Sequence, residues 1–198
     1  MAQLVYVSLA NPGAPWQTVS GAILSTAATA TLSPEGAGGV GDDPQIFSFY
    51  QGQVIRVTAR GVYTSSATAN NATFALYASA SAVALASGTS LATTGALPLT
   101  TTALTGSKWK LEAFIQVRAY AQGTGTATVY TDGDVELQTA TPTAGVANVT
   151  IWPMPSISGP FAASLDTTIT HTIGLVGTLS STNDSITCTQ FLLEPLAG

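Results

Sequence analysis

The chain has 198 residues and is poor in charge, because charged side chains make up 8% of it, against about 25% in ordinary soluble proteins. Its net charge is −5, and its five Lys and Arg are too few to form the basic stripe that nucleic acids require. An acidic chain with no run of about 18 apolar residues also argues against an anionic membrane surface as a partner and against a transmembrane helix.

The first 45 residues are rich in Gly and Pro and have a weak hydrophobic pattern. No basic residue precedes their short apolar stretch, so they do not resemble a signal peptide. We expect residues 1–45 to supply an arm, packed on a neighbouring molecule, and the first strands, while residues 46–198 complete a single domain. The side chains that we expect to anchor the arm are Leu4, Tyr6 and Trp16.

Later segments alternate apolar and polar residues with a period of two and are enriched in Val, Ile, Thr, Tyr and Phe, which is typical of half-buried antiparallel strands. In the last segment the alternation places Ile186, Cys188 and Leu192 on one face and Phe191 on the other. The segments are 53–64, 72–79, 108–120, 126–131, 135–138, 169–179 and 185–196, and weaker patterns precede them at 16–33 and 44–50.

The segments between these patterns contain turn residues. Ser-Thr-Asn-Asp at 181–184 separates two strong strands, so we predict a closing hairpin there. Residues 78–87 are rich in Ala and suit either a short helix or an extended segment, and we expect the extended form. The stretch 87–106 is low in complexity, but four leucines predict an ordered crossing loop and a strand: Leu91, Leu97, Leu99 and Leu104.

About eight antiparallel strands with no internal repeat predict an all-β protein. The strand number and the long early connections favour a two-sheet sandwich, and a jelly roll is the topology that we expect.

The strand at 108–120 carries three of the five positive charges. Trp109 and its alternate neighbours form an apolar face, and the cations lie on the opposite face together with large aromatic residues. Aromatic residues and Arg on a polar face are typical of interfaces, so we predict that an identical subunit covers this face; a loop folded over the sheet is the alternative. The predicted interface residues are Arg56, Arg60, Lys110, Phe114, Gln116, Arg118 and Tyr120.

Alternate carboxylates at Asp132, Asp134 and Glu136 point the same way in a strand and are weak candidates for a Ca²⁺ site. A hairpin at Asp-Gly, or a bulge at Gly133, explains the same residues more simply. We therefore predict no metal and no cofactor.

His171 and Cys188 are the only histidine and cysteine, so the chain lacks the three or four ligands of a zinc site and any internal disulfide. Each lies in phase with apolar residues, and we expect both to be packed in the core. A catalytic pair would need both side chains exposed and a third orienting group. No phosphate loop or nucleophile elbow appears either, so we predict that the protein is not an enzyme.

Residues 61–138 contain a strand ending in Gly-Val-Tyr, a Phe-Ala-Leu-Tyr strand, an Ala/Thr/Leu-rich crossing and a Trp-Lys-Leu-Glu strand that leads to a Gly-Thr turn. In this order of strands, over about residues 50–196, the chain resembles small virion proteins of tailed bacteriophages of actinobacterial hosts.

The resemblance implies a jelly roll that decorates the phage capsid as a homotrimer, contacts the major capsid protein and belongs to the virion. An alternative is a tail-fibre or receptor-binding module for host glycans, with Trp152 or Tyr63 as stacking platforms. A third is a glycan hydrolase, which would need a carboxylate pair that includes Asp132 and Asp134.

Overall fold

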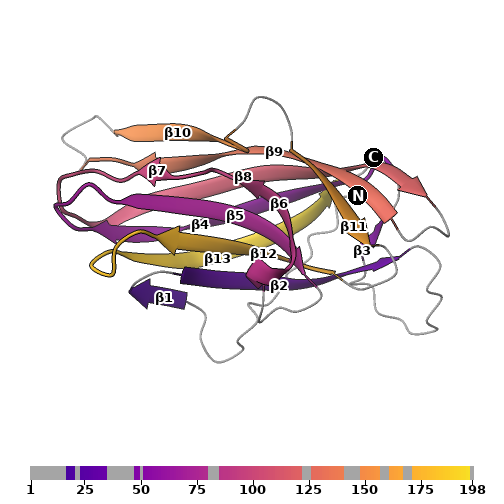
Figure 1. The fold of residues 1–198 in the computed structure, drawn as a ribbon, viewed down its shortest axis with the longest axis horizontal. Coiled ribbons are helices and arrows are strands. Elements are labelled where there is room, and N and C mark those ends of the chain that lie inside the picture. Colours follow the sequence, from indigo (N-terminus) through magenta and orange to yellow (C-terminus); the bar gives the residue numbers. More distant parts are fainter. Residues whose placement is uncertain are drawn as a thin grey trace.

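A computed structural model describes residues 17–20, 23–34, 47–49, 51–79, 85–121, 126–140, 148–156, 161–166 and 171–196, with side chains from Gln51 onward. These residues form two stacked sheets (Figure 1). In this view β10 (Val149–Met154) lies at one edge of the molecule, and β1 (Gln17–Ser20) and β2 (Ile23–Pro34) lie at the opposite edge.

One sheet has seven strands and contains the segment richest in charge. Its order is β1, β13 (Ser185–Leu196), β4 (Val54–Ser65), β8 (Leu104–Ala121), β9 (Thr126–Gln138) and β10, and β11 (Phe161–Asp166) pairs with the other end of β9. All of these pairs are antiparallel.

The other sheet has six strands. Its order is β3 (Phe47–Phe49), β2, β12 (His171–Leu179), β5 (Asn71–Ser79) and β6 (Thr89–Thr93), and β7 (Leu97–Pro98) also pairs with β5. Strands β2 and β3 are parallel, and the other pairs are antiparallel.

The strand order is that of a jelly roll. Eight strands form two four-stranded sets, β1-β13-β4-β8 and β2-β12-β5-β6, so the chain alternates between the sheets as in a double Greek key. The predicted all-β sandwich is therefore confirmed. The structure has more strands than the eight predicted because β9, β10 and β11 extend one sheet and the short β3 and β7 join the other.

The core lies between the sheets and follows the predicted alternation. Every second residue of β8 from Trp109 to Val117 is buried, and Phe74 and Leu76 of β5 are buried with them. The four leucines of the 87–106 stretch are also buried, so this low-complexity segment is anchored as predicted.

The turn at 181–184 does not close a hairpin, so this prediction was wrong. It joins β12 in one sheet to β13 in the other. The buried Asp184 carboxylate accepts hydrogen bonds from the Ser66 backbone N–H at 2.7 Å and from its hydroxyl at 2.9 Å. This contact fixes the turn to the connection between β4 and β5, which crosses between the same two sheets.

A bulge in β13 overturns the predicted faces of its second half. The register passes from Cys188 opposite Gly61 to Gln190 opposite Arg60, so Thr189 is an extra residue. Phe191 is therefore buried, and Leu192 turns toward the outer face.

The Asp132–Asp134 segment forms neither a turn nor a bulge, because β9 pairs with β8 continuously through it. A Cβ atom on Gly133 would lie 2.3 Å from the backbone oxygen of Glu112, so only glycine permits this close approach of the strands. Here the steric need for glycine within a strand explains a dipeptide that usually marks a hairpin.

Two regions of the sequence predictions are described only in part. Within residues 78–87, Ala78 and Ser79 end β5 and 85–87 form a 3₁₀ turn. Strands β1 and β2 pair with β13 and β12, while the proposed anchors Leu4, Tyr6 and Trp16 lie outside the described residues. No helix in the described part is long and apolar enough to cross a membrane.

Candidate functional site

The outer face of the seven-stranded sheet carries every positive charge of the chain. The sequence has five Lys and Arg, and all five lie on the neighbouring strands β4 and β8. We call the outward side chains of β13, β4, β8, β9 and β10 the charged face. Its cations are Arg56, Arg60, Lys108, Lys110 and Arg118.

Five of the ten acidic residues share the charged face, so its formal charge is balanced. They are Glu112, Asp132, Asp134, Glu136 and Glu194. By contrast, the strands of the six-stranded sheet contain no Asp, Glu, Lys or Arg. The two outer surfaces of the sandwich therefore differ sharply in chemistry.

A network of ion pairs connects four strands of the charged face. Glu112 of β8 lies 2.7 Å from the Arg56 guanidinium and 3.2 Å from the Lys110 ammonium. Arg56 also reaches Glu194 of β13 at 3.6 Å, and Lys110 reaches Glu136 of β9 at 3.6 Å. Arg56 and Lys110 are therefore paired with carboxylates across the sheet within one subunit.

Three side chains of the charged face have displaced pKa values. The hydrogen bond between Glu112 and Lys110 lowers the pKa of Glu112 and raises the pKa of Lys110. The pKa of Asp134 is raised, first by burial and then by the neighbouring charge of Glu136. The ionised form of Asp134 is thus disfavoured, because the charge of Lys110 offsets these two effects only in part.

Five charges of the face take no part in this network. Within the described residues, Arg60, Lys108, Arg118, Asp132 and Asp134 form no ion pair. The cations among them lie on β4 and β8, and the carboxylates lie on β9. The unpaired positive charges and the unpaired negative charges therefore lie on different strands of the face.

The charged face also carries all the exposed large hydrophobic side chains of the described residues. Phe114 of β8 is 40% exposed, and Val149 and Ile151 of β10 are 46% and 63% exposed. Their backbone partners Gln138 and Glu136 place the two β10 residues on the same face as Lys110. Apolar residues gathered on one face of a charge-poor protein mark a surface that a partner covers.

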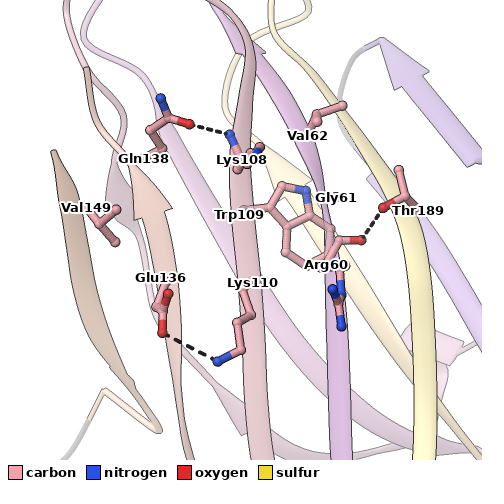
Figure 2. Close-up of a pocket in the computed structure, with 10 residues that line it drawn as sticks. All are labelled: Arg60, Gly61, Val62, Lys108, Trp109, Lys110, Glu136, Gln138, Val149 and Thr189. Carbon is pink, nitrogen blue, oxygen red and sulfur yellow. Dashed lines mark hydrogen bonds and ion pairs between the residues drawn. The ribbon is translucent and has the colours of Figure 1, made fainter. Parts of the chain in front are cut away.

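The first depression in the charged face has a volume of about 640 Å³ and lies between β13, β4, β8, β9 and β10. Three cations line this depression: Arg60 of β4, and Lys108 and Lys110 of β8. Figure 2 shows Trp109 between these two strands. Hydrogen bonds fix the rim of the depression: the Gln138 side chain accepts from the Lys108 backbone at 3.1 Å, and the Thr189 hydroxyl donates to the Arg60 carbonyl at 3.1 Å.

The second depression, of about 430 Å³, lies farther along β8. Arg118 lies over the Tyr130 ring with its guanidinium carbon 5.6 Å from the ring centre, and it donates to the Gln116 side chain at 3.1 Å. The exposed Phe114 and the unpaired Asp132 also line it. This arrangement combines apolar faces with hydrogen-bonding groups.

Six of the seven predicted interface residues lie on the charged face, namely Arg56, Arg60, Lys110, Phe114, Gln116 and Arg118. The seventh residue, Tyr120, cannot be placed on this face by alternation, because the register of β8 with β9 shifts between Val117 and Ala119. The backbone of Tyr120 pairs with Ala127, and its side chain lies outside the described part. That a subunit covers this face remains a prediction.

The two aromatic residues expected to stack on glycans are not exposed platforms. Tyr63 is 3% exposed, and its hydroxyl donates to the Gln138 carbonyl. Trp152 is partly buried and packs against the core. Alternation along β10 places its apolar neighbours on the outer face instead.

The candidate metal ligands stand in a row along β9 rather than around one point. In the described part of the chain, no group of three His, Cys, Asp or Glu side chains is placed to hold a metal ion. Glu136 is engaged with Lys110 instead.

The structure also separates the candidate nucleophilic pair. His171 begins β12 in one sheet, is buried, and donates from Nε2 to the Asp166 carbonyl at 2.6 Å. Cys188 lies in β13 of the other sheet, where burial raises the pKa of its thiol to about 12. A thiol with this pKa stays protonated at neutral pH and is a poor nucleophile.

One carboxylate pair has pKa values displaced in opposite directions, as acid–base catalysis requires. Glu112 and Asp134 lie opposite each other on β8 and β9. However, Glu112 is held by two cations, and neither carboxylate lines either depression. Neither of these two depressions therefore places a sugar ring against this pair of carboxylates.

Three residues of the charged face were not predicted from the sequence, namely Val149, Ile151 and Tyr130. The signal was present in β10, where Val149, Ile151 and Trp152 place apolar residues on both faces of one strand. A strand apolar on both faces indicates that both faces are covered.

The chain matches none of the protein-family models, none of the curated proteins and none of the solved structures with which it was compared.

Proposed function

We propose that the protein is a structural component of a bacteriophage virion, which decorates the capsid as a homotrimer and strengthens its shell without catalysing a reaction. One observation carries the proposal: the charged face gathers all five cations and the exposed Phe114, Val149 and Ile151, while the other sheet is uncharged. Such a mixture of aliphatic, aromatic and Arg side chains is the composition of a protein–protein interface.

The sequence resemblance to tailed-phage virion proteins supplies the capsid as the location, and the jelly-roll strand order supports it. In this proposal copies of the chain meet through the charged face, and the N-terminal segment with Leu4, Tyr6 and Trp16 contacts the major capsid protein. Each contact contributes a small binding free energy, and the symmetry of the shell repeats the contact many times.

The test uses the phage whose genome encodes the chain. We expect purified virions to contain it in many copies, and cryo-electron microscopy to place it on the capsid. Virions that lack it should release their DNA at a lower temperature than complete virions. Absence of the chain from virions, or density for it only on the tail, would overturn the proposal.

The second depression favours a second candidate, a receptor-binding module for glycans. Phe114 offers an exposed ring, and Asp132 and Gln116 offer hydrogen-bonding groups beside it. Such a module binds a glycan array, and the substitution Phe114→Ala abolishes that binding while the fold is kept. No binding to any glycan, together with attachment to empty capsids, would exclude this candidate.

A further inference from the structure

The unpaired charges of the charged face are arranged for contact with another copy of the chain. Arg60, on β4, is exposed and without an ion-pair partner in the described residues. Asp132 and Asp134 are unpaired on β9, two strands away. Since β4 and β9 are separated by β8 and lie about 10 Å apart, these groups cannot neutralise one another within one subunit.

We propose that the subunits of the symmetric assembly meet head to tail through this face, with β4 of one copy lying against β9 of the next and Arg60 binding the partner's Asp134. The proposal rests on the symmetric oligomer of the proposed function and assigns its contact. Such a heterologous contact uses two different patches on each copy and closes into a ring.

The heights of the charges along the strands bring Arg60 within one row of the partner's Asp134 in this contact. Arg56, Phe114 and Asp132 occupy one row across the sheet. Arg60 lies in the row of Glu136, one row from Asp134. A ring axis parallel to the strands keeps these heights, so Arg56 meets the next copy at the level of Asp132, and Arg60 is one row, about 7 Å, from Asp134. The long Arg side chain spans that offset.

A twofold contact of the face with itself fits the charges less well. An axis across the strands would place β9 on β9, and so carboxylates on carboxylates. An axis along β8 would place β4 on the partner's β9, but it would also place Lys110 opposite Lys110 and Glu112 opposite Glu112. An axis along the strands between β8 and β9 would place Glu112 opposite the partner's Asp134, because these residues share a row. Like charges brought together in this way repel one another and disfavour the arrangement.

The apolar residues agree with the same contact. Val149 and Ile151 lie on β10, beside β9, and are covered when β4 of a neighbour approaches β9. The raised pKa of Asp134 is consistent with a carboxylate that lacks its cation in the isolated subunit.

The test is reversal of one charge and its repair. Arg60→Glu and Asp134→Arg each place like charges in the proposed contact, so we expect the mass in solution to fall from that of the oligomer to the 20.0 kDa of one chain. The double variant Arg60→Glu/Asp134→Arg restores the attraction in the opposite sense, and we expect the oligomer to return. Light scattering coupled to size-exclusion chromatography measures the masses.

The matched control is Thr178→Glu, which adds a charge at an exposed position of the uncharged sheet and should leave the oligomer intact. Circular dichroism shows whether each variant is folded. An oligomer that survives both single reversals overturns the contact and leaves the proposed function standing. A wild-type chain that is itself a single subunit overturns both.

Discussion

Gly61 of β4 packs against Trp109 of β8 and the backbone of β13 with no room for a side chain. The indole of Trp109 reaches under β4 to donate to the Thr187 carbonyl of β13 at 3.2 Å, and it packs on Phe74 with ring centres 5.1 Å apart. This path exists because position 61 has no side chain: a Cβ there would lie 2.8 Å from Trp109 Nε1 and 1.8 Å from the Thr187 oxygen.

We expect Gly61→Ala to lower the free energy of unfolding by about 1–3 kcal/mol or more, because β4 and β13 must move apart to admit the methyl group. Urea unfolding measures the change. Val62→Ala is the control, since Val62 is only partly buried and lies on the outer face. Equal stability of the two variants would contradict this account of Gly61.

The buried phenol of Tyr63 makes stability depend on pH in the alkaline range. Burial raises its pKa from 10.0 to about 12. Between these values the unfolded chain loses the proton while the folded chain keeps it, so the free energy of unfolding falls as the pH rises from 10 to 12. Cys188, raised from 9.0 to about 12, acts in the same direction.

Tyr63→Phe should therefore flatten the fall in stability above pH 10 without abolishing it, while lowering stability at neutral pH through loss of the bond to Gln138. Urea unfolding at a series of pH values measures both effects. An unchanged alkaline slope would show that Tyr63 ionises normally in the folded protein.

Between elements, the buried Asp184 joins two of the connections that cross from sheet to sheet at one end of the sandwich. Its carboxylate accepts two hydrogen bonds from Ser66, whose hydroxyl also accepts one from Asn70 at 2.9 Å. We expect Asp184→Ala to cost about 1–3 kcal/mol, because it leaves the Ser66 N–H without a partner. Asn183→Ala, exposed in the same turn, should change the unfolding midpoint little, and equal losses would refute the role of Asp184.

The same turn shows what the sequence predicts about elements and what it does not. Alternation identified most strands and their buried faces, because burial against a core leaves a direct trace in the residue pattern. Turn residues at 181–184 look alike whether the next strand pairs with the previous one or joins the other sheet. That choice depends on β4 and β5, more than a hundred residues earlier. The bulge at Thr189 likewise depends on pairing with β4.

The candidate site could be predicted from the sequence only in part. The pattern of β8 placed Lys110, Phe114 and Gln116 together correctly, because they belong to one regular strand. The unpaired carboxylates of β9 came into the site only through register with β8, which no local pattern reveals. At Gly133 the local turn signal predicted the wrong structure.

Considered as a whole, the molecule has one sheet surface with charged and apolar side chains and one without charge. If the charged face is a subunit contact, Ile151→Ser should weaken association while leaving the fold intact, because a side chain 63% exposed contributes little to subunit stability. Sedimentation velocity over a dilution series measures the association, and thermal unfolding checks the fold. Thr178→Ser on the other sheet is the control. Identical dissociation on dilution for both variants would show that β10 lies outside the contact.

The confinement of Lys and Arg to two strands also affects proteolysis. Trypsin cleaves only after these residues, and Arg56, Arg60, Lys108 and Lys110 lie where β4 and β8 pair with each other inside the sheet. Arg118 differs, because it lies at the register shift of β8 and beyond the end of the pairing with β4. A protease needs an extended, unpaired segment in its active site, so the first four sites become accessible only when these central strands separate. Trypsin should therefore cut the native chain first after Arg118, and digest the other four sites at a rate set by opening of the sandwich.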